Sequence, residues 1–368
     1  MLTERSGAHP RVLFLSHELG GGGAERVTVN LANYLVEKEW PVYLLPLQVG
    51  LPPYPIDSRV NVDTGIPQGG SRYARGLRKL SYIVRALRVF KPDVVVSLDA
   101  GFPYLALPTL GTPFKLVTQL ATDPTYQMAR GRSFHLMYNR VFANSDRIVF
   151  QTEGARDFFR EGVRRKGVIL SNPLRHDLVH NPSPFEDRDK EIVSFGRLIP
   201  QKRPDVLVAA FAEFHKKYPD YHLSMFGDGE LEQKVRSQIQ GLGLNDVVTL
   251  SGFRADIHDR IRNAGMYVLS SDVEGLPNAM LEAMAMGIPS VCTDCAPGGA
   301  REMIERYKCG ELTSAGDPKA LAAAMDKVVS NPALADEFIA AGAAVGHDLS
   351  GDRIYEQWAE LIANVAKS

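Results

Sequence analysis

The sequence predicts an α/β protein made of two domains, each built on a parallel sheet. Short apolar runs, typical of buried parallel strands, alternate with segments of helical periodicity. This alternation starts again near residue 191, after a polar stretch. The chain has 368 residues, too many for one ordinary hydrophobic core, so two domains of about 170 residues each are expected.

Apolar runs mark the expected strands. In the first half of the chain they lie at 11–16, 42–45, 91–97, 114–118, 147–152 and 168–174. In the second half they lie at 191–196, 221–226, 247–253 and 266–269, and another begins at 291. Residues 50–70 are rich in Pro and Gly and are expected to be irregular, whereas a helix is expected near 257–264. Alanine-rich helices follow from Pro318, and the last of them is amphipathic and suited to cross back to the first domain.

One stretch, residues 270–289, has the pattern of a turn, a helix, a second turn and the start of a strand. Gly275 permits a sharp turn, and Pro277 suits a first helical position because its missing N–H is not needed there. Gly287 is suited to end the helix. We therefore expect a helix that begins beside Pro277, directly after a buried strand.

Two carboxylates bracket the start of this helix. Glu274 precedes it, and Glu282 lies about five residues in, roughly 7–8 Å further along the axis. The unpaired N–H groups of a helix N-terminus attract a phosphate, and carboxylates accept hydrogen bonds from sugar hydroxyls. A nucleotide diphosphate sugar offers phosphates between two hydroxylated rings. Taken alone, the two acids are better explained as a loop acid and a solvated helix position, because exposed acids are common.

A glycine-rich loop follows the first strand. Residues 20–23 are all Gly, and a helix with Val27, Leu31 and Leu35 on one face comes next. Such a loop lets backbone N–H groups approach an anion. The G-x-G-x-x-G dinucleotide fingerprint is incomplete, and no acid ends the next strand, so a dehydrogenase is not supported.

Two cations lie at the corresponding turn of the second half. Arg197 and Lys202 are five residues apart, directly after the strand at 191–196. Arg can bind phosphate oxygens through two parallel hydrogen bonds, and Lys adds a point charge, so together they suit a departing diphosphate without a metal. Two exposed loop cations are the alternative.

Composition describes a globular protein of nearly neutral charge. Hydrophobic residues make up 45%, and the formal net charge is −1, so nucleic acid is not an expected partner. No run of eighteen apolar residues exists and the N-terminal residues lack an apolar core, so we expect a cytoplasmic protein. Three cysteines are too few for a disulfide framework, and Cys292 and Cys295 have no second pair to complete a zinc site.

The segment 72–91 is basic and amphipathic. Its cations occur with no acid between them, at Arg72, Arg75, Arg78, Lys79, Arg85, Arg88 and Lys91. The apolar residues expected on its other face are Tyr73, Leu77, Leu80, Val84 and Leu87. Such a helix can rest on anionic lipid head groups or hold the phosphates of a lipid-linked acceptor, and an ordinary surface helix packed on the sheet is the alternative.

The polar segment that follows the first domain holds two weak metal-like patterns. His176 and His180 lack the Glu of an H-E-x-x-H motif, and Asp187 with Asp189 precedes no recognisable metal site. We interpret both as solvated linker residues, and no metal or cofactor is expected.

The stretch from Glu274 to Glu282 resembles the E-x7-E segment of the family 4 retaining glycosyltransferases, which have the GT-B fold of two Rossmann-like domains facing across a cleft. The resemblance implies that Glu274 lies near the transferred sugar and that Glu282 binds the nucleotide ribose. Arg197 and Lys202 match the family's G-R-x4-K diphosphate ligands. The remaining donor contacts implied are Gly22, Gly23, Gly227, Phe253, Gly275, Leu276, Pro277 and Asn278.

The chain departs from the family pattern at one position. Many members have a His after the strand at 114–118, and the matching residue here is Gln119, which cannot titrate. Gln119 and Asp123 are therefore candidates for acceptor or donor-sugar contacts. The loop at 297–302 is similar to the subset of the family that builds bacterial surface polysaccharides, although Ala300 stands where Pro is common.

The resemblance implies a metal-independent, retaining transferase that uses a nucleotide-sugar donor, with UDP favoured, and a saccharide or lipid-linked acceptor. We expect an acceptor domain at 1–173, joined by helix 352–368, a linker at 174–190 and a donor domain at 191–351. The protein would lie in the cytoplasm or on the inner face of the membrane. A nucleotide-sugar epimerase of the same architecture and a non-catalytic sugar-nucleotide-binding subunit are the alternatives.

Overall fold

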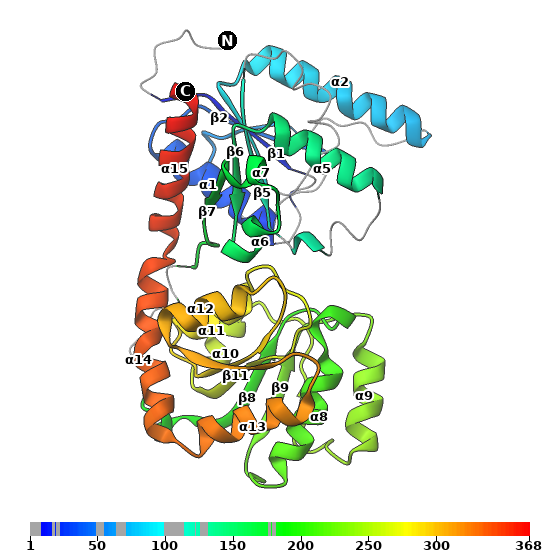
Figure 1. Cartoon of the computed structure of the whole chain (residues 1–368), viewed down its shortest axis with the longest axis vertical. Helices are drawn as coiled ribbons and strands as arrows, with labels where there is room; N and C mark the ends of the chain where they lie inside the picture. Colours follow the sequence, from blue (N-terminus) through cyan, green and yellow to red (C-terminus); the bar gives the residue numbers. More distant parts are fainter. Residues whose placement is uncertain are drawn as a thin grey trace. The chain divides into compact units, whose positions relative to one another are not determined.

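The computed structural model describes residues 9–16, 19, 23–48, 55–63, 71–98, 114–121, 123–125, 132–175, 178 and 182–368. The chain forms two compact units (Figure 1). Unit 1 contains Met1–Pro173 and Asp352–Ser368, and unit 2 contains Leu174–Gly351. Unit 1 is therefore discontinuous in sequence.

Unit 1 is built around a parallel sheet. In its described residues the strand order is β3-β2-β1-β4-β5-β6-β7. The strands are β1 (Val12–Ser16), β2 (Val42–Pro46), β3 (Asn61–Val62), β4 (Val94–Leu98), β5 (Lys115–Leu120), β6 (Arg147–Phe150) and β7 (Gly167–Ile169). The helices are α1 (Gly23–Glu37), α2 (Arg72–Phe90), α5 (Arg132–Asn144), α6 (Glu153–Asp157) and α7 (Glu161–Arg164), with α15 (Gly351–Lys367) joining this unit from Asp352 onward. Strand β3 shows that the region 50–70, expected to be irregular, contributes to the sheet.

Unit 2 is also built around a parallel sheet. Its described strands have the order β10-β9-β8-β11-β12-β13 and pair in parallel. They are β8 (Asp189–Phe195), β9 (His222–Phe226), β10 (Val248–Leu250), β11 (Ala264–Leu269), β12 (Ser290–Asp294) and β13 (Gly310–Ser314). The helices are α8 (Pro204–His215), α9 (Glu232–Gly241), α10 (Ile257–Ile261), α11 (Asn278–Ala285), α12 (Gly299–Tyr307), α13 (Pro318–Val329) and α14 (Pro332–Asp348), with short 3-10 turns η2 (Phe185–Asp187) and η3 (Pro200–Lys202). The helix expected near 257–264 ends earlier, because Ala264 already belongs to β11.

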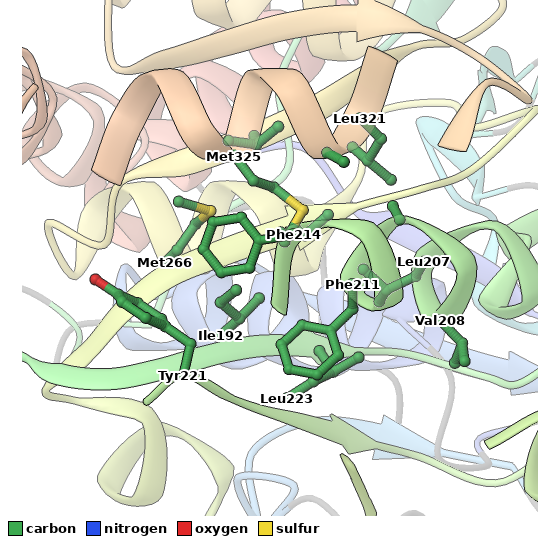
Figure 2. Close-up of a cluster of buried hydrophobic side chains, with 14 of the residues drawn as sticks. Ile192, Leu207, Val208, Phe211, Phe214, Tyr221, Leu223, Met266, Leu321 and Met325 are labelled. Atoms are coloured by element: carbon green, nitrogen blue, oxygen red, sulfur yellow. The ribbon is translucent and has the colours of Figure 1, made fainter. Parts of the chain in front are cut away.

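The core of unit 2 lies between its sheet and helices α8 and α13. Figure 2 shows Phe211 and Phe214 of α8 and Leu321 and Met325 of α13 among side chains from the strands. Burying each large apolar side chain stabilises the fold by about 1.5–3 kcal/mol. This core keeps the sheet rigid beneath the loops that follow its strands.

Helix α2 has the predicted bounds, but its buried face is rotated from the one expected. Leu77 is 70% exposed, whereas Ile83, Ala86 and Phe90 are buried against the sheet. The face predicted from Leu77, Leu80, Val84 and Leu87 was therefore wrong at Leu77. The 3.6-residue period leaves two neighbouring faces open when apolar residues are dense, and packing on the sheet selects one of them.

Candidate active site

The strand order of unit 2 changes direction at β8, which lies between β9 and β11. In open parallel sheets, ligands bind beyond the carboxyl ends of the strands at such a switch point. The loop after β8 carries Arg197 and Lys202, and the loop after β11 carries Glu274. The topology therefore brings together residues that are more than 70 positions apart in the chain.

Lys202 and Glu274 are in direct contact. The Lys202 ammonium donates a hydrogen bond to the Glu274 carboxylate, and the side chains are 27% and 13% exposed. Ser271 Oγ donates to the same carboxylate oxygen over 2.8 Å. The Ser271 carbonyl in turn accepts a bond of 2.6 Å from Thr293 Oγ1 on β12. Glu274 is thus held from the next strand of the sheet as well as by Lys202.

Arg197 lines the same pocket as Lys202 but is exposed. The pocket lies over the ends of β8, β9 and β11. Its lining consists of Ser194, Phe195, Gly196, Arg197, Leu198, Lys202, Pro204, Met225, Phe226, Leu269, Ser270 and Ser271. Both predicted diphosphate ligands therefore line one pocket. Glu274 does not line it but contacts Lys202, which does.

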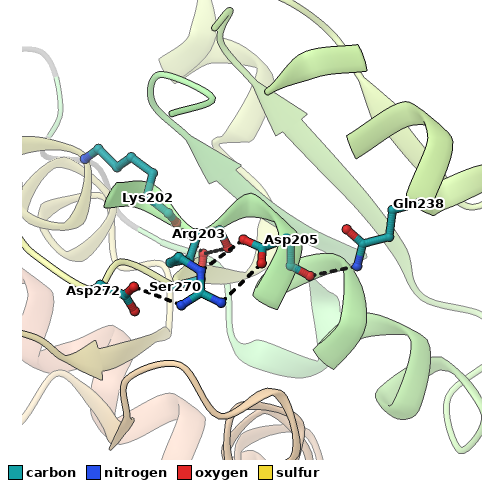
Figure 3. A network of polar contacts seen from close by, with 6 residues as sticks. All are labelled: Lys202, Arg203, Asp205, Gln238, Ser270 and Asp272. Carbon is teal, nitrogen blue, oxygen red and sulfur yellow. Dashed lines mark hydrogen bonds and ion pairs between the residues drawn. The ribbon is translucent and has the colours of Figure 1, made fainter. Parts of the chain in front are cut away.

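A polar network anchors the Lys202 loop to the Glu274 loop (Figure 3). Arg203 adopts a left-handed conformation and pairs with Asp272 over 2.8 Å and with Asp205 through two bonds of 3.1 and 3.2 Å. Ser270 Oγ donates to the carbonyls of Lys202 and Arg203. The Lys202 side chain extends away from this network in the figure. The network fixes the backbone at Lys202 and Arg203, while the Lys202 ammonium points away from it.

The charges of this network are mutually stabilised. The hydrogen bonds that the Arg203 guanidinium donates to the carboxylates of Asp205 and Asp272 raise the pKa of Arg203. Burial alone would raise the pKa of Asp205, but the pairing with Arg203 outweighs it and lowers that pKa. Both groups therefore stay charged near neutral pH.

Glu282 lies inside unit 2 rather than in solvent. It is on α11, which begins at Asn278 with Pro277 as its N-cap residue, one position later than predicted. The Glu282 residue is 7% exposed, and its Oε2 lies 3.0 Å from Nε2 of His258 on α10. The His258 ring in turn packs edge-on against Phe195, which lines the pocket. Glu282 is thus connected to the pocket wall through two aromatic rings.

Tyr267 lies on β11 beneath both acids. It is fully buried, and its hydroxyl has no hydrogen-bond partner among the described residues. Burial, followed by the nearby Cys292, Glu274 and Glu282, raises the pKa of Tyr267 well above its ordinary value. The phenol is therefore neutral, and it lies near both carboxylates.

The three cysteines are free and buried. Burial raises the pKa of Cys295 and of Cys309 to about 12 and that of Cys292 well above its ordinary value. These thiols are protonated at neutral pH, as is typical of structural rather than reactive cysteines.

The loops after β9 and β10 adjoin the same edge of the sheet. Gly227 N donates to the Gly252 carbonyl over 2.9 Å, and Asp228 Oδ1 accepts from Phe253 N. A Cβ at Gly227 would lie 2.1 Å from the Gly196 carbonyl, so only glycine fits there. Phe253 is 73% exposed. Its ring is accessible for contact with a planar ligand.

The other predicted site residues lie elsewhere. Gly22 is outside the described residues, as are His176 and His180, and Gly23 is the first residue of α1. Gln119 is buried within β5 of unit 1, between β4 and β6, rather than after the strand. Asp123 is also buried, and its Oδ1 accepts from Thr125 N.

Sequence reasoning missed the residues that support the acids. Ser271 lies three positions before Glu274 and could have been noticed as a short-range partner. His258 is 24 positions from Glu282, and no sequence signal connects them. Arg203 adjoins the predicted Lys202, but its two carboxylate partners become apparent only in the fold.

The chemistry available at this edge is anion binding and hydrogen bonding to hydroxyls. Arg197 and Lys202 supply positive charge, and the two acids supply acceptors. Within the described ranges, no group of three or more His, Cys, Asp or Glu side chains is arranged to hold a metal ion. No described helix is both long and apolar enough to cross a lipid bilayer.

The two doubly wound sheets define the GT-B class of glycosyltransferase folds. Anabaena HepE in complex with UDP has a TM-score of 0.78 at 19% identity, over 96% of this chain and 100% of that one. Sucrose-phosphate synthase from Thermosynechococcus elongatus has a TM-score of 0.79 at 18% identity, over 97% of this chain and 100% of that one. The fold prediction is confirmed.

Sequence comparison identifies the family. The model for glycosyl transferases group 1 matches residues 175–345, and the model for glycosyltransferase family 4 matches residues 21–178. Together the two models span residues 21–345, so the chain belongs to the group 1 and family 4 glycosyltransferases and is a glycosyltransferase.

Two relatives match almost the whole chain. An uncharacterized glycosyltransferase of Haemophilus influenzae is 26% identical, over 95% of this chain and 98% of that protein. An α-1,4-N-acetyl-D-galactosaminyltransferase of Campylobacter jejuni, whose name specifies an undecaprenol-linked acceptor, is 25% identical over 96% of this chain and 99% of that protein.

Proposed function

We propose that the chain transfers a hexose or N-acetylhexosamine, with retention of configuration, from a nucleotide diphosphate sugar to a saccharide or lipid-linked saccharide in cell-surface polysaccharide synthesis. UDP is the favoured nucleotide, since HepE is described with UDP and UDP-glucose. The relatives include the undecaprenol-dependent enzyme above and an amylovoran biosynthesis glycosyltransferase of Erwinia amylovora. Unit 2 would hold the donor and unit 1 the acceptor.

The observation that carries this proposal is the contact of Lys202 with Glu274 beside Arg197, at the switch point of unit 2. When the bond between the sugar C1 and the β-phosphate oxygen breaks, its electron pair remains on the diphosphate. Fixed cations stabilise that charge as it develops, in the manner of an oxyanion hole. Lys202 and Arg197 would have this role, together with the backbone N–H groups at the start of α11.

Glu274 would orient the transferred sugar by accepting hydrogen bonds from its hydroxyls. Ser271 supports this role because it binds the same carboxylate oxygen as Lys202 and so keeps Glu274 oriented when the ammonium turns toward phosphate. The acceptor hydroxyl would attack C1 from the face that the diphosphate leaves, and its proton would pass to the departing phosphate oxygen. Transfer with retention follows from this same-face attack.

A transfer assay with UDP-sugars tests the proposal. A panel of UDP-hexoses and UDP-N-acetylhexosamines is first screened by thermal shift, because a ligand that binds only the folded state raises its stability by about 2.7 kcal/mol at 100 times its Kd. The best donor is then incubated with undecaprenol-linked saccharides, and the anomeric configuration of the product is read by NMR. Retained configuration and dependence on acceptor are expected.

Donor incubated alone is the control for the alternatives. An epimerase would convert the donor without acceptor, and a binding subunit would shift the melting temperature without any hydrolysis or transfer. Either result would contradict the proposed transfer.

We also propose that α2 docks on an anionic membrane surface. Its exposed cations are Arg75, Arg85, Arg88 and Lys91, and Leu77 and Val89 are exposed beside them. Basic helices with exposed apolar side chains bind anionic lipid head groups at the interface. A peripheral position on the inner face of the membrane would place the enzyme near a lipid-linked acceptor.

A further inference from the structure

His258 occupies a defined place behind the pocket wall. Its ring centroid lies 6.5 Å from that of Phe195, at an interplanar angle of 86°. On another side, its Nε2 lies 3.0 Å from Glu282 Oε2. The side chains of His258 and Glu282 are only 14% and 9% exposed. This imidazole therefore connects a carboxylate to an aromatic residue that lines the pocket.

The direction of the hydrogen bond follows from the chemistry of the pair. An ionised carboxylate can only accept hydrogen bonds, so the imidazole Nε2 must carry the hydrogen. A charged group removed from water needs such a partner. A hydrogen bond to a charged acceptor also contributes more to stability than one between two neutral groups. The bond to His258 also restricts rotation of the carboxylate, because one of its oxygens is held against α10.

Glu282 is the fifth residue of α11, a short helix that begins soon after the loop carrying Glu274. Its companion acid, Glu274, is held by Lys202 and Ser271 at the other side of that helix start. The two acids therefore have separate partners. A role in packing alone would require only an aromatic ring at position 258, whereas the observed pair requires a donor directed at Oε2.

We propose that His258 is a positioning residue that orients the Glu282 carboxylate toward the ribose hydroxyls of the donor nucleotide and so favours ribonucleotides over deoxyribonucleotides. The proposal rests on the proposed function, because it takes Glu282 as the ribose contact. The two hydroxyls of a vicinal diol can both donate hydrogen bonds to one carboxylate. If the carboxylate is misaligned, at least one of these hydrogen bonds is bent and weakened.

The test measures binding of UDP and of 2′-deoxy-UDP by calorimetry. For the unmodified protein we expect UDP to bind about tenfold more tightly, the loss expected for one hydrogen bond to a charged group. His258→Phe keeps the ring but removes the donor, so the preference should fall to nearly one. His258→Gln keeps an N–H near the same place and should restore most of the preference. His222→Phe, at an exposed position on β9, is the control and should change nothing.

The outcomes separate the inference from the proposed function. If the unmodified protein binds neither UDP nor another nucleoside diphosphate, the proposed function fails and this inference with it. If UDP binds and the preference is the same in His258→Phe, only the positioning role of His258 is overturned.

A second measurement needs no substitution, in case His258→Phe does not fold. The imidazole nitrogen signals of His258 in the intact protein should shift when UDP is added but not when inorganic pyrophosphate is added, because pyrophosphate has no ribose. Equal responses to the two probes, or none to UDP, would overturn the proposal.

Discussion

At the level of single residues, Lys202 offers the sharpest test of the diphosphate site. Lys202→Ala should reduce turnover by about 10²–10³-fold, the range observed when one fixed donor to a developing oxyanion is removed. Lys202 and Glu274 are largely buried, so removing the ammonium should also lower the free energy of unfolding, by about 1–3 kcal/mol, while Ser271 still donates to the carboxylate. Steady-state kinetics and chemical denaturation measure the two effects.

Lys190→Ala is the matched control for that substitution. Lys190 is exposed and, within the described residues, forms an ion pair with Asp220, away from the loops after β8 and β11. Turnover should stay at the unmodified level. Undiminished turnover in Lys202→Ala would remove Lys202 from the proposed mechanism.

The buried cysteines provide a residue-level test of the unit 2 core. Because burial raises the pKa of Cys295 and Cys309 to about 12, almost no thiolate is present at neutral pH. The native protein should therefore react slowly with an aromatic disulfide reagent and quickly once unfolded in guanidinium. Ser237→Cys, at an exposed position on α9, should react at once and serves as the control. Rapid native labelling of the unmodified chain would mean that this core opens readily.

Some residues of the candidate site could be predicted from the sequence, and others could not. Arg197, Lys202, Glu274 and Glu282 were predictable because each lies at a strand-to-helix turn or on the first turns of a helix, and such positions are local in sequence. Their partners were not. Ser271 was within reach of the pattern, but His258 meets Glu282 only after α10 and α11 pack side by side.

At the level of elements, the contact of α14 with α11 is tight enough to be tested by a single methyl group. A Cβ at Gly342 on α14 would lie 2.1 Å from the Met284 carbonyl on α11. Gly342→Ala should therefore destabilise unit 2 by about 1–3 kcal/mol or more, as overpacked cores do, and displace the helix that carries Glu282.

The control for this change is Gly241→Ala. Gly241 ends α9, and nothing lies within 4 Å of a Cβ built there. Replacing an exposed helical Gly by Ala raises the free energy of unfolding by about 0.5–1 kcal/mol. Denaturant midpoints measured by circular dichroism compare the two variants. Equal midpoints would show that α11 and α14 are packed more loosely than described.

Helix α2 can be tested through its charge. The combined variant Arg75→Glu, Arg85→Glu and Arg88→Glu should abolish cosedimentation with vesicles containing anionic lipid, since each cation near such a surface contributes about 1 kcal/mol. Added salt should weaken binding of the unmodified protein in the same direction. The matched variant Arg147→Glu, Arg164→Glu and Arg165→Glu makes the same charge change elsewhere in unit 1 and should bind normally. Equal loss in both variants would assign binding to overall charge.

Element prediction succeeded where periodicity and turn residues agreed. Gly287 ends α11 in a left-handed conformation, as its position predicted. The prediction of the buried face of α2 was wrong at Leu77, because the sequence of this helix permits more than one apolar face and packing on the sheet selects one of them. Strand β3 was missed because two residues are too few to show a period.

At the level of the whole molecule, the doubly wound order explains why the candidate site could be assembled from separated motifs. The βα alternation predicts parallel strands, and parallel strands place their carboxyl ends along one edge. Which strands are neighbours is a nonlocal property that the alternation does not encode. The pairing of β8 with β11 brings Lys202 to Glu274 and makes one site of two motifs.

The discontinuity of unit 1 leads to a last prediction. Residues Asp352–Ser368 belong to unit 1, where Tyr355 of α15 packs beside Tyr34 of α1 with ring centroids 5.6 Å apart. Ile362 lies seven positions further on the same face of α15 and is fully buried. Ile362→Ala should lower the free energy of unfolding of unit 1 by about 2–5 kcal/mol, the usual cost of such a cavity.

Hydrogen exchange followed by mass spectrometry can locate that loss. Protection should fall in β1, β2 and α1, while peptides from β8, β9 and β11 keep theirs, because the cavity weakens only the unit that contains it. Glu356→Gln is the control: it weakens an exposed ion pair of 3.0 Å with Lys38 but keeps an oxygen that can accept from the Tyr34 hydroxyl, so it should cost less than about 1 kcal/mol. If Ile362→Ala lowered protection equally in both sheets, the two units would unfold as one cooperative body and α15 would stabilise the whole chain.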